Sequence, residues 1–227
     1  MERIIGVFFE PTATFADIAK SPGFVAPLIL VIICTLGVSS VMFLKVDTEL
    51  MMRQQMSKNS RFTDLPKEQQ EKQIEVAAKF SKYFFFAVPV VLPIVWLALA
   101  GILFMMANFI FGGSATFKQM FSVVAHAQLP GIILGMLGVV ILFLKDPADI
   151  DVQNLVASNL GPLISAETSK VGHRLAMSID LFSFWQMFLL GKGISASARL
   201  SFAKALMAVV IPWLLYVLVV TGFAALQ

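Results

Sequence analysis

Charged side chains are missing from four long stretches of this 227-residue chain, of which only 14% is Asp, Glu, Lys or Arg. Soluble domains carry about 25% charged residues. A helix needs about 20 apolar residues to cross the roughly 30 Å hydrocarbon core of a bilayer, and soluble core helices rarely exclude charge for so long. The sequence therefore predicts a protein that crosses a membrane several times. The uncharged stretches are 24–44, 83–117, 119–144 and 205–227.

Cysteine and histidine are also scarce. The only cysteine, Cys34, falls within the first uncharged stretch, and the two histidines, His126 and His173, are far apart. This pattern excludes a disulfide framework and argues against a metal site. The motifs HExxH, CxxC, GxSxG, Walker A and GxGxxG are missing as well. We therefore expect no catalytic residue, no cofactor, no metal and no enzymatic activity.

The remaining composition agrees with a membrane protein. Apolar residues make up 58% of the chain, and the mean hydropathy is +0.85. The net charge of +3 is small and scattered, whereas nucleic-acid binding needs a clustered basic face. We expect membrane lipids, other membrane proteins and further copies of the chain as partners, and no nucleic acid.

The expected fold class is all-α, a polytopic membrane protein with a five-helix transmembrane bundle that forms one domain over residues 1–227. The fourth span is the weakest, because Asp180 and Lys192 bracket only eleven uncharged residues. Charges near span ends can reach the headgroups at modest cost, so we count this segment as crossing, with a re-entrant hairpin as the alternative. The predicted spans are 24–44, 84–111, 120–144, 179–197 and 205–226.

Residues 1–23 are interpreted as a segment that lies at the membrane interface, the alternative being a poorly ordered tail. Phe15, Ile18 and other apolar residues would lie at the headgroup boundary, and Arg3, Asp17 and Lys20 would face water.

Two polar connections separate the spans. Residues 45–82 carry eight Lys or Arg and six Asp or Glu. Their second half is predicted to form a helix that starts near Pro66, gains from the Glu68–Lys72 spacing and continues into the second span. This helix is either simply solvated or a docking surface. The other connection, 145–178, is predicted to hold two short helical pieces that break at Asn159–Pro162.

The third span carries small residues at four-residue spacing. Gly131 and Gly135 form a GxxxG pattern, extended by Ala127 and Gly138, and such ridges let helix backbones approach closely. We expect this ridge to be the packing centre of the bundle, through contacts within the chain or between two copies.

Polar side chains within the spans are candidates for function. Ser122 and His126 share one helix face, and Asp180 and Gln186 lie at the start of the fourth span. They form either interhelical hydrogen bonds and interface anchors or a transport pathway.

Four pieces of the sequence resemble the Yip (Ypt/Rab-interacting protein) family of five-span membrane proteins in its short bacterial form. The pieces are residues 10–18 (EPTATFADI), 115–130 (ATFKQMFSVVAHAQLP), 179–186 (IDLFSFWQ) and 201–206 (SFAKAL). The resemblance implies packing roles for Phe117, Phe121, Leu129, Pro130, Asp180, Phe182 and Trp185. His126 stands where the family pattern has an aromatic residue such as Tyr. Small-GTPase binding, expected of eukaryotic members with a long cytosolic N-terminal region, is not carried over, because 23 residues precede the first predicted span here.

We interpret the chain as a non-enzymatic membrane scaffold or assembly factor, with a small-solute or lipid transporter as the alternative. Lys and Arg are distributed too evenly for the positive-inside rule to set the orientation. The resemblance implies a bacterial inner membrane and a cytoplasmic N-terminus. The candidate packing and intramembrane polar residues are Phe117, His126, Pro130, Gly131, Gly135, Asp180, Trp185 and Gln186.

Overall fold

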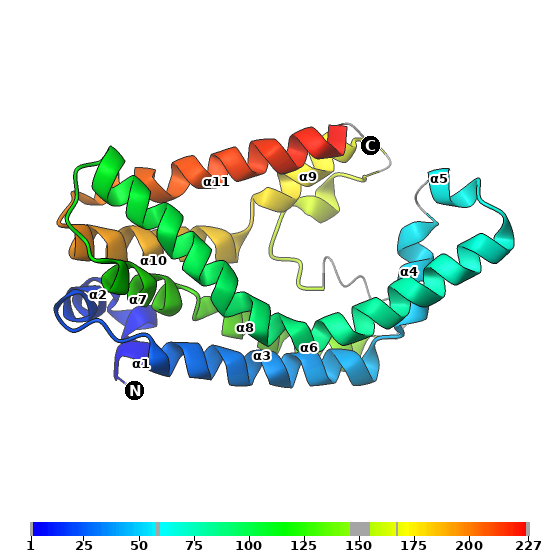
Figure 1. Cartoon of the computed structure of the whole chain (residues 1–227), viewed down its shortest axis with the longest axis horizontal. Helices are drawn as coiled ribbons and strands as arrows, with labels where there is room; N and C mark the ends of the chain where they lie inside the picture. Colours follow the sequence, from blue (N-terminus) through cyan, green and yellow to red (C-terminus); the bar gives the residue numbers. More distant parts are fainter. Residues whose placement is uncertain (1, 58–59, 146–154, 167, 226–227) are drawn as a thin grey trace. The chain divides into compact units, whose positions relative to one another are not determined.

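The computed structural model describes residues 2–57, 60–145, 155–166 and 168–225. Within these ranges the chain is all-α, and one isolated bridge between Asn159 and Asp180 is its only β-type pairing (Figure 1). The chain divides into two compact units. The first unit comprises Met1–Val31, Pro93–Leu134 and Ala157–Gln227, and the second comprises Ile32–Leu92 and Gly135–Val156.

Four helical segments are long and apolar enough to cross a membrane. They correspond to the first, second, third and fifth predicted spans. The segments are α3 (Val25–Lys45), α6 (Lys67–Met105) with the π-helical turn η1 (Met106–Ile110), α7 (Phe117–Ala127) followed by α8 (Pro130–Leu144), and α11 (Phe202–Ala225).

The predicted fourth span is the helix α10 (Leu181–Ala198), which is not among these four segments. Gln186, Lys192 and three serines lower its apolar character. The five-span count is therefore not confirmed by helix length and composition.

The second span and the helix before it are continuous, as predicted. α6 begins directly after Pro66, where a missing backbone N–H does no harm, and it extends through Pro89 and Pro93. Two further helices precede it in the polar connection, α4 (Thr48–Met56) and the short α5 (Ser60–Thr63). The side chain of Asp47 caps α4 by accepting hydrogen bonds from the N–H groups of Glu49 and Leu50 at 3.0 Å each.

The third span is not one continuous helix, which corrects the prediction for residues 120–144. α7 ends at Ala127, and α8 begins at Pro130. Proline has no N–H to bond the carbonyl four residues earlier, and its ring would clash with that carbonyl. The carbonyl in question, His126 O, instead accepts a hydrogen bond from Leu129 N at 3.2 Å. Pro130 thus serves as the first residue of a new helix.

The N-terminal segment forms two helices, α1 (Glu2–Phe9) and α2 (Pro11–Lys20), rather than a disordered tail. Phe15 and Ile18 of α2 have no exposed surface. These two side chains therefore pack inside the protein instead of facing lipid, because α2 packs against α7 and α10. The interfacial place of residues 1–23 stays a prediction. Phe9, with 80% of its surface exposed, is free to contact lipid.

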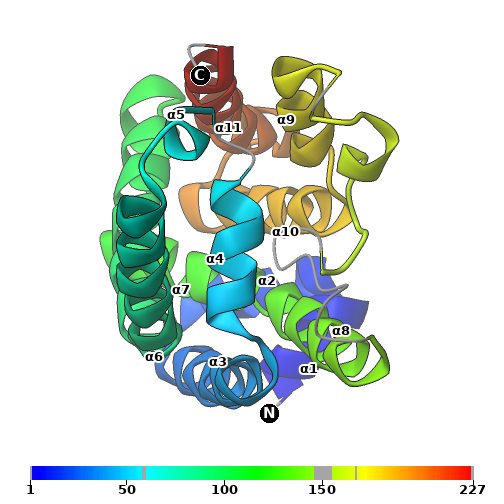
Figure 2. The ribbon, with the colours of Figure 1, turned by 90° about the vertical axis from the view of Figure 1, so that its right-hand side faces the viewer.

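In the first unit, α10 is the helix around which the others pack, rather than the small-residue ridge of the third span. It lies between α11 on one side and α2 and α7 on the other (Figures 1 and 2). The small residues Gly191, Gly193 and Ser197 are buried on α10 and let its neighbours approach. Gly193 lies against Val123 of α7 and Phe15 of α2.

The loop between η1 and α7 depends on two glycines. Gly112 has φ of +72°, a conformation that side chains disfavour. A Cβ on the next residue, Gly113, would lie 2.8 Å from both Ala107 O and Ala198 Cβ. The chain therefore makes a tight turn at Phe111–Ser114.

The second unit has a small core of its own, in which Val46 and Leu142 are buried. Gly135 of α8 lies against α3, because a Cβ there would stand 3.2 Å from Val38 Cγ2. The Lys45 ammonium lies 4.7 Å from the centre of the Phe143 ring. Partly buried residues around the core are Val41, Met42, Met51 and Leu155.

The connection at 145–178 lies partly outside the described residues, including most of its first predicted helical piece. The 3₁₀ turn η4 (Gly161–Leu163) overlaps the predicted break, and the helix α9 (Lys170–Ser178) follows it.

Candidate functional site

Asp180 is the N-cap of α10. Its Oδ2 accepts a hydrogen bond from Ser183 N at 2.7 Å, and its Oδ1 accepts one from the Ser158 hydroxyl. The backbone joins the same two segments, since Leu181 N donates to Ser158 O at 3.0 Å. Both carboxylate oxygens are thus used to start α10 and to attach the preceding connection to it.

Trp185 and Gln186 follow on the same helix. The Trp185 ring lies 5.7 Å from Phe8 of α1 and 6.2 Å from Phe182, measured between ring centres. Gln186 lies beside Gly131, where a Cβ would stand 3.8 Å from Gln186 Nε2. The structure therefore brings together Gly131 and Gln186, two of the residues predicted from the sequence.

His126 is buried on α7, with 1% of its surface exposed. Its Nδ1 lies 2.8 Å from Ser122 O. The Ser122 hydroxyl does not face the imidazole as a partner, because it donates to Lys118 O at 2.8 Å. His126 also lines an open pocket of about 640 Å³, together with Arg3 and Asp17.

The remaining candidates lie elsewhere. Phe117 begins α7 and packs on Phe104, with 6.1 Å between ring centres. Pro130 begins α8. Gly135 belongs to the second unit and faces Val38. The eight predicted residues therefore do not form one site.

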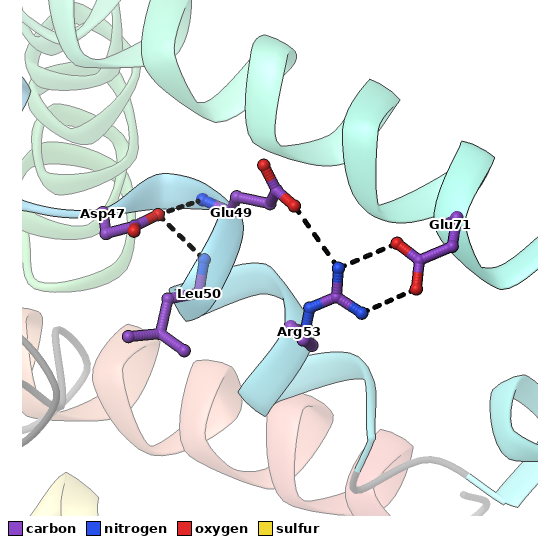
Figure 3. Close-up of polar contacts among 5 residues, drawn as sticks. All are labelled: Asp47, Glu49, Leu50, Arg53 and Glu71. Atoms are coloured by element: carbon purple, nitrogen blue, oxygen red, sulfur yellow. Dashed lines mark hydrogen bonds and ion pairs between the residues drawn. The ribbon is translucent and has the colours of Figure 1, made fainter.

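A cluster of charges between α4 and α6 escaped the sequence analysis (Figure 3). Arg53 donates to both oxygens of Glu71, at 2.7 Å and 2.8 Å, and to Glu49 at 3.3 Å. These hydrogen bonds hold the pKa of Glu71 below its ordinary value and raise the pKa of Arg53 further above neutrality. The i,i+4 spacing of Glu49 and Arg53 is a visible signal, but no local pattern pairs Arg53 with Glu71.

The ion pair between Arg3 and Asp17 was missed too. Arg3 Nε lies 2.6 Å from Asp17 Oδ2, and Arg3 Nη1 donates to Ser21 O at 2.7 Å. The pair ties α1 to α2 at the edge of the pocket. Across the described ranges no three His, Cys, Asp or Glu side chains gather as they would around a metal ion.

Comparison with known families matches residues 5–224, nearly the whole chain, to the Yip1 domain. No curated protein and no solved structure matches the chain. The match agrees with the four apolar helical segments and with the resemblance found in the sequence motifs. The chain therefore belongs to the Yip1 family and is an integral membrane protein.

Proposed function

We propose that the protein is a non-enzymatic membrane scaffold or assembly factor that binds partner membrane proteins through a charged surface on α4 and α6. We call this the α4–α6 surface; its residues are Glu49, Arg53, Glu68, Glu71 and Lys72. The observation that carries the proposal is the bidentate contact of Arg53 with Glu71, because it holds two helices of a polar connection in a fixed arrangement.

A simply solvated connection has no need of such a contact. An exposed ion pair contributes little stability, but a bidentate Arg–carboxylate contact adds geometric specificity. Glu68 and Lys72 form a second pair 2.7 Å apart, and all of these side chains are substantially exposed. The surface thus presents both signs of charge in a fixed pattern, which favours a partner of complementary pattern.

Polar residues of the apolar helices support the same proposal, because they serve the architecture. Asn108 donates to Ala115 O at 2.8 Å and accepts from Ala115 N at 2.9 Å, which fixes the loop after η1. Asp180 uses both oxygens at the start of α10. A solute pathway would need such groups to be available, so we do not propose the transporter.

We further propose that α10 crosses the membrane as a fourth of five spans, in one domain, with the N-terminus in the cytoplasm of a bacterial cell and the chain in its inner membrane. The 18 residues of α10 span about 27 Å. Because α2, α7 and α11 surround it, it needs less apolar character than a helix that faces lipid. The Lys192 ammonium lies 4.8 Å and 5.5 Å from the ring centres of Phe202 and Phe188, which stabilise its charge.

The scaffold proposal is tested by purification from native membranes with protein partners identified by mass spectrometry. The variant Glu68→Lys with Lys72→Glu keeps the net charge and the i,i+4 pair but inverts the charge pattern. We expect the partners captured by the wild type to be lost. Differently tagged copies of the chain, expressed together, show whether one partner is the chain itself.

The matched control is Glu10→Lys with Lys204→Glu, which inverts two exposed charges outside the α4–α6 surface. This control is expected to retain the partners. Equal capture by the wild type and both variants would contradict the role given to the surface, and solute uptake by reconstituted vesicles would contradict the scaffold itself.

A further inference from the structure

The pocket beside His126 combines charged and buried polar groups from four helices of the first unit. Glu2 and Arg3 come from α1, Asp17 from α2, and His126 from α7, while the first residues of α3 complete the lining. Its volume of about 640 Å³ is within the range of small-ligand sites. None of these residues belongs to the α4–α6 surface, so the inference does not rest on the proposed scaffold function.

The hydrogen-bonding state of His126 defines one wall of the pocket. Ser122 O can only accept, so the neutral imidazole carries its proton on Nδ1. Nε2 is then an acceptor, and it has no partner among the described residues. Because His126 lines the pocket, an imidazole acceptor that no described residue uses favours a ligand that donates a hydrogen bond.

The carboxylates extend this acceptor character. Glu2 and Asp17 both line the pocket, and of these two only Asp17 has a partner among the described residues, through one oxygen with Arg3 Nε. With one guanidinium against two carboxylates, the pocket is not suited to a simple anion. A ligand ammonium group, in contrast, finds acceptors on Glu2, Asp17 and His126.

Groups suited to a phosphate lie in the same pocket. Arg3 uses Nε and Nη1 within the protein, and its Nη2 has no partner in the described part of the chain. The pocket also includes Val25 and Ala26 in the first turn of α3, where backbone N–H groups precede the first intrahelical bond. Free N–H groups and the helix dipole favour an anionic group at this end.

The position of the pocket indicates where such a ligand comes from. α3 is a candidate span, and its first turn marks the start of an uncharged stretch. On α1, Ile5 and Phe9 are exposed apolar residues. Polar groups in the pocket thus lie next to surfaces suited to acyl chains, as the headgroup and tail of a lipid require.

We propose that this pocket binds a phosphate ester that carries a primary amine, and that the headgroup of a phospholipid supplies it. The amine donates to Glu2, Asp17 and His126 Nε2, and the phosphate accepts from Arg3 and the first turn of α3. A soluble amine phosphoester shares this chemistry and is distinguished from the lipid by the experiment.

The test is titration of the full chain in detergent with single lipids, followed by native mass spectrometry. Phosphatidylethanolamine offers three N–H donors, phosphatidylcholine offers a cation without donors, and phosphatidylglycerol has no amine. We expect phosphatidylethanolamine to bind on the order of tenfold more tightly than either, as for a charge-assisted hydrogen bond. Glu2→Gln should remove most of this preference, because it neutralises an exposed acceptor without disturbing the fold.

The matched control is Glu10→Gln, which removes an exposed carboxylate of the same N-terminal segment outside the pocket and should leave the preference unchanged. Competition by glycerophosphoethanolamine at the lipid's own concentration would assign a soluble ester, and failure to compete would assign the lipid. Equal binding of the three lipids, preference for phosphatidylglycerol, or an unchanged preference in Glu2→Gln would overturn the proposal.

Discussion

Single polar side chains in this protein join segments that are distant in sequence. Gln119 is one example: its Oε1 accepts from Thr116 N at 2.7 Å within a capping box, while its Nε2 donates to Ala19 O of α2 at 2.8 Å. Asp180 likewise caps α10 and holds Ser158. Helices that are already surrounded by lipid gain little from further apolar burial, so such contacts matter for how they assemble.

Asp180→Ala is expected to lower the stability of the fold by about 1 kcal/mol, the usual cost of losing an N-cap. Asp180→Asn should retain most of the stability, because asparagine caps a helix as well as aspartate does. Thermal unfolding of the purified chain in detergent compares the two variants. A wild-type melting temperature for the alanine variant would show that the cap contributes nothing.

The contact between Arg53 and Glu71 should respond to acid. Glu71 lies ahead of the uncharged part of α6, and its pKa is lowered by the hydrogen bonds from Arg53. A group with a lowered folded-state pKa contributes stability above its unfolded pKa and loses it as the pH falls through the folded value. We therefore expect α4 to loosen from α6 as the pH drops below about 4.5, the ordinary value for glutamate.

Hydrogen exchange of the α4 amides, corrected for the intrinsic pH dependence, measures this loosening. The effect is small because both side chains are exposed. Glu71→Gln should exchange faster at neutral pH and show no further acid step, while Glu75→Gln should behave like the wild type. An acid step of equal size in Glu71→Gln would assign the loosening to another group.

At the scale of helices, close approach between α8 and α3 depends on Gly135. A side chain there would meet Val38, so Gly135→Leu should destabilise the fold by roughly 1–3 kcal/mol through overpacking. Gly37→Leu is the matched control, because Gly37 lies next to Val38 on the same helix and has open space around it. Thermal unfolding of both variants in detergent is the measurement, and equal melting temperatures would mean that Gly135 does not face α3.

Helices of the apolar stretches could be predicted because the absence of charge over about 20 residues is a local signal. α3 begins and ends within one residue of the prediction. The break between α7 and α8 also has a local cause in Pro130, but proline is often tolerated within membrane helices, where neighbours satisfy the freed backbone groups. Whether Pro130 breaks the helix therefore depends on the groups packed around it, which the sequence does not show.

Other features depend on contacts that sequence spacing does not reveal. An amphipathic segment beside a membrane can turn its apolar face to lipid or to protein, and Phe15 turns to α7 and α10. Arg53 could have paired with any carboxylate of its connection, and Glu71 lies 18 residues away. The pocket at His126 is lined by residues of α1, α2 and α3 as well, so no single sequence motif predicts it.

At the scale of the whole molecule, the number of membrane spans depends on α10. By composition, α10 is less apolar than the four candidate spans. Its burial among α2, α7 and α11 is the reason that a less apolar helix could cross the membrane. If α10 crosses, the chain has five spans and its two ends lie on opposite sides of the membrane. If it does not, four spans return both ends to the same side.

The side of the membrane on which Gln227 lies is thus the most direct test. Reporter fusions at Gln227, at Met1 and within the 145–178 connection locate all three in intact cells. We predict that Gln227 and the connection lie together on the outer side, opposite Met1. Finding Gln227 on the same side as Met1, with the connection opposite, would contradict the crossing of α10 and the five-span fold.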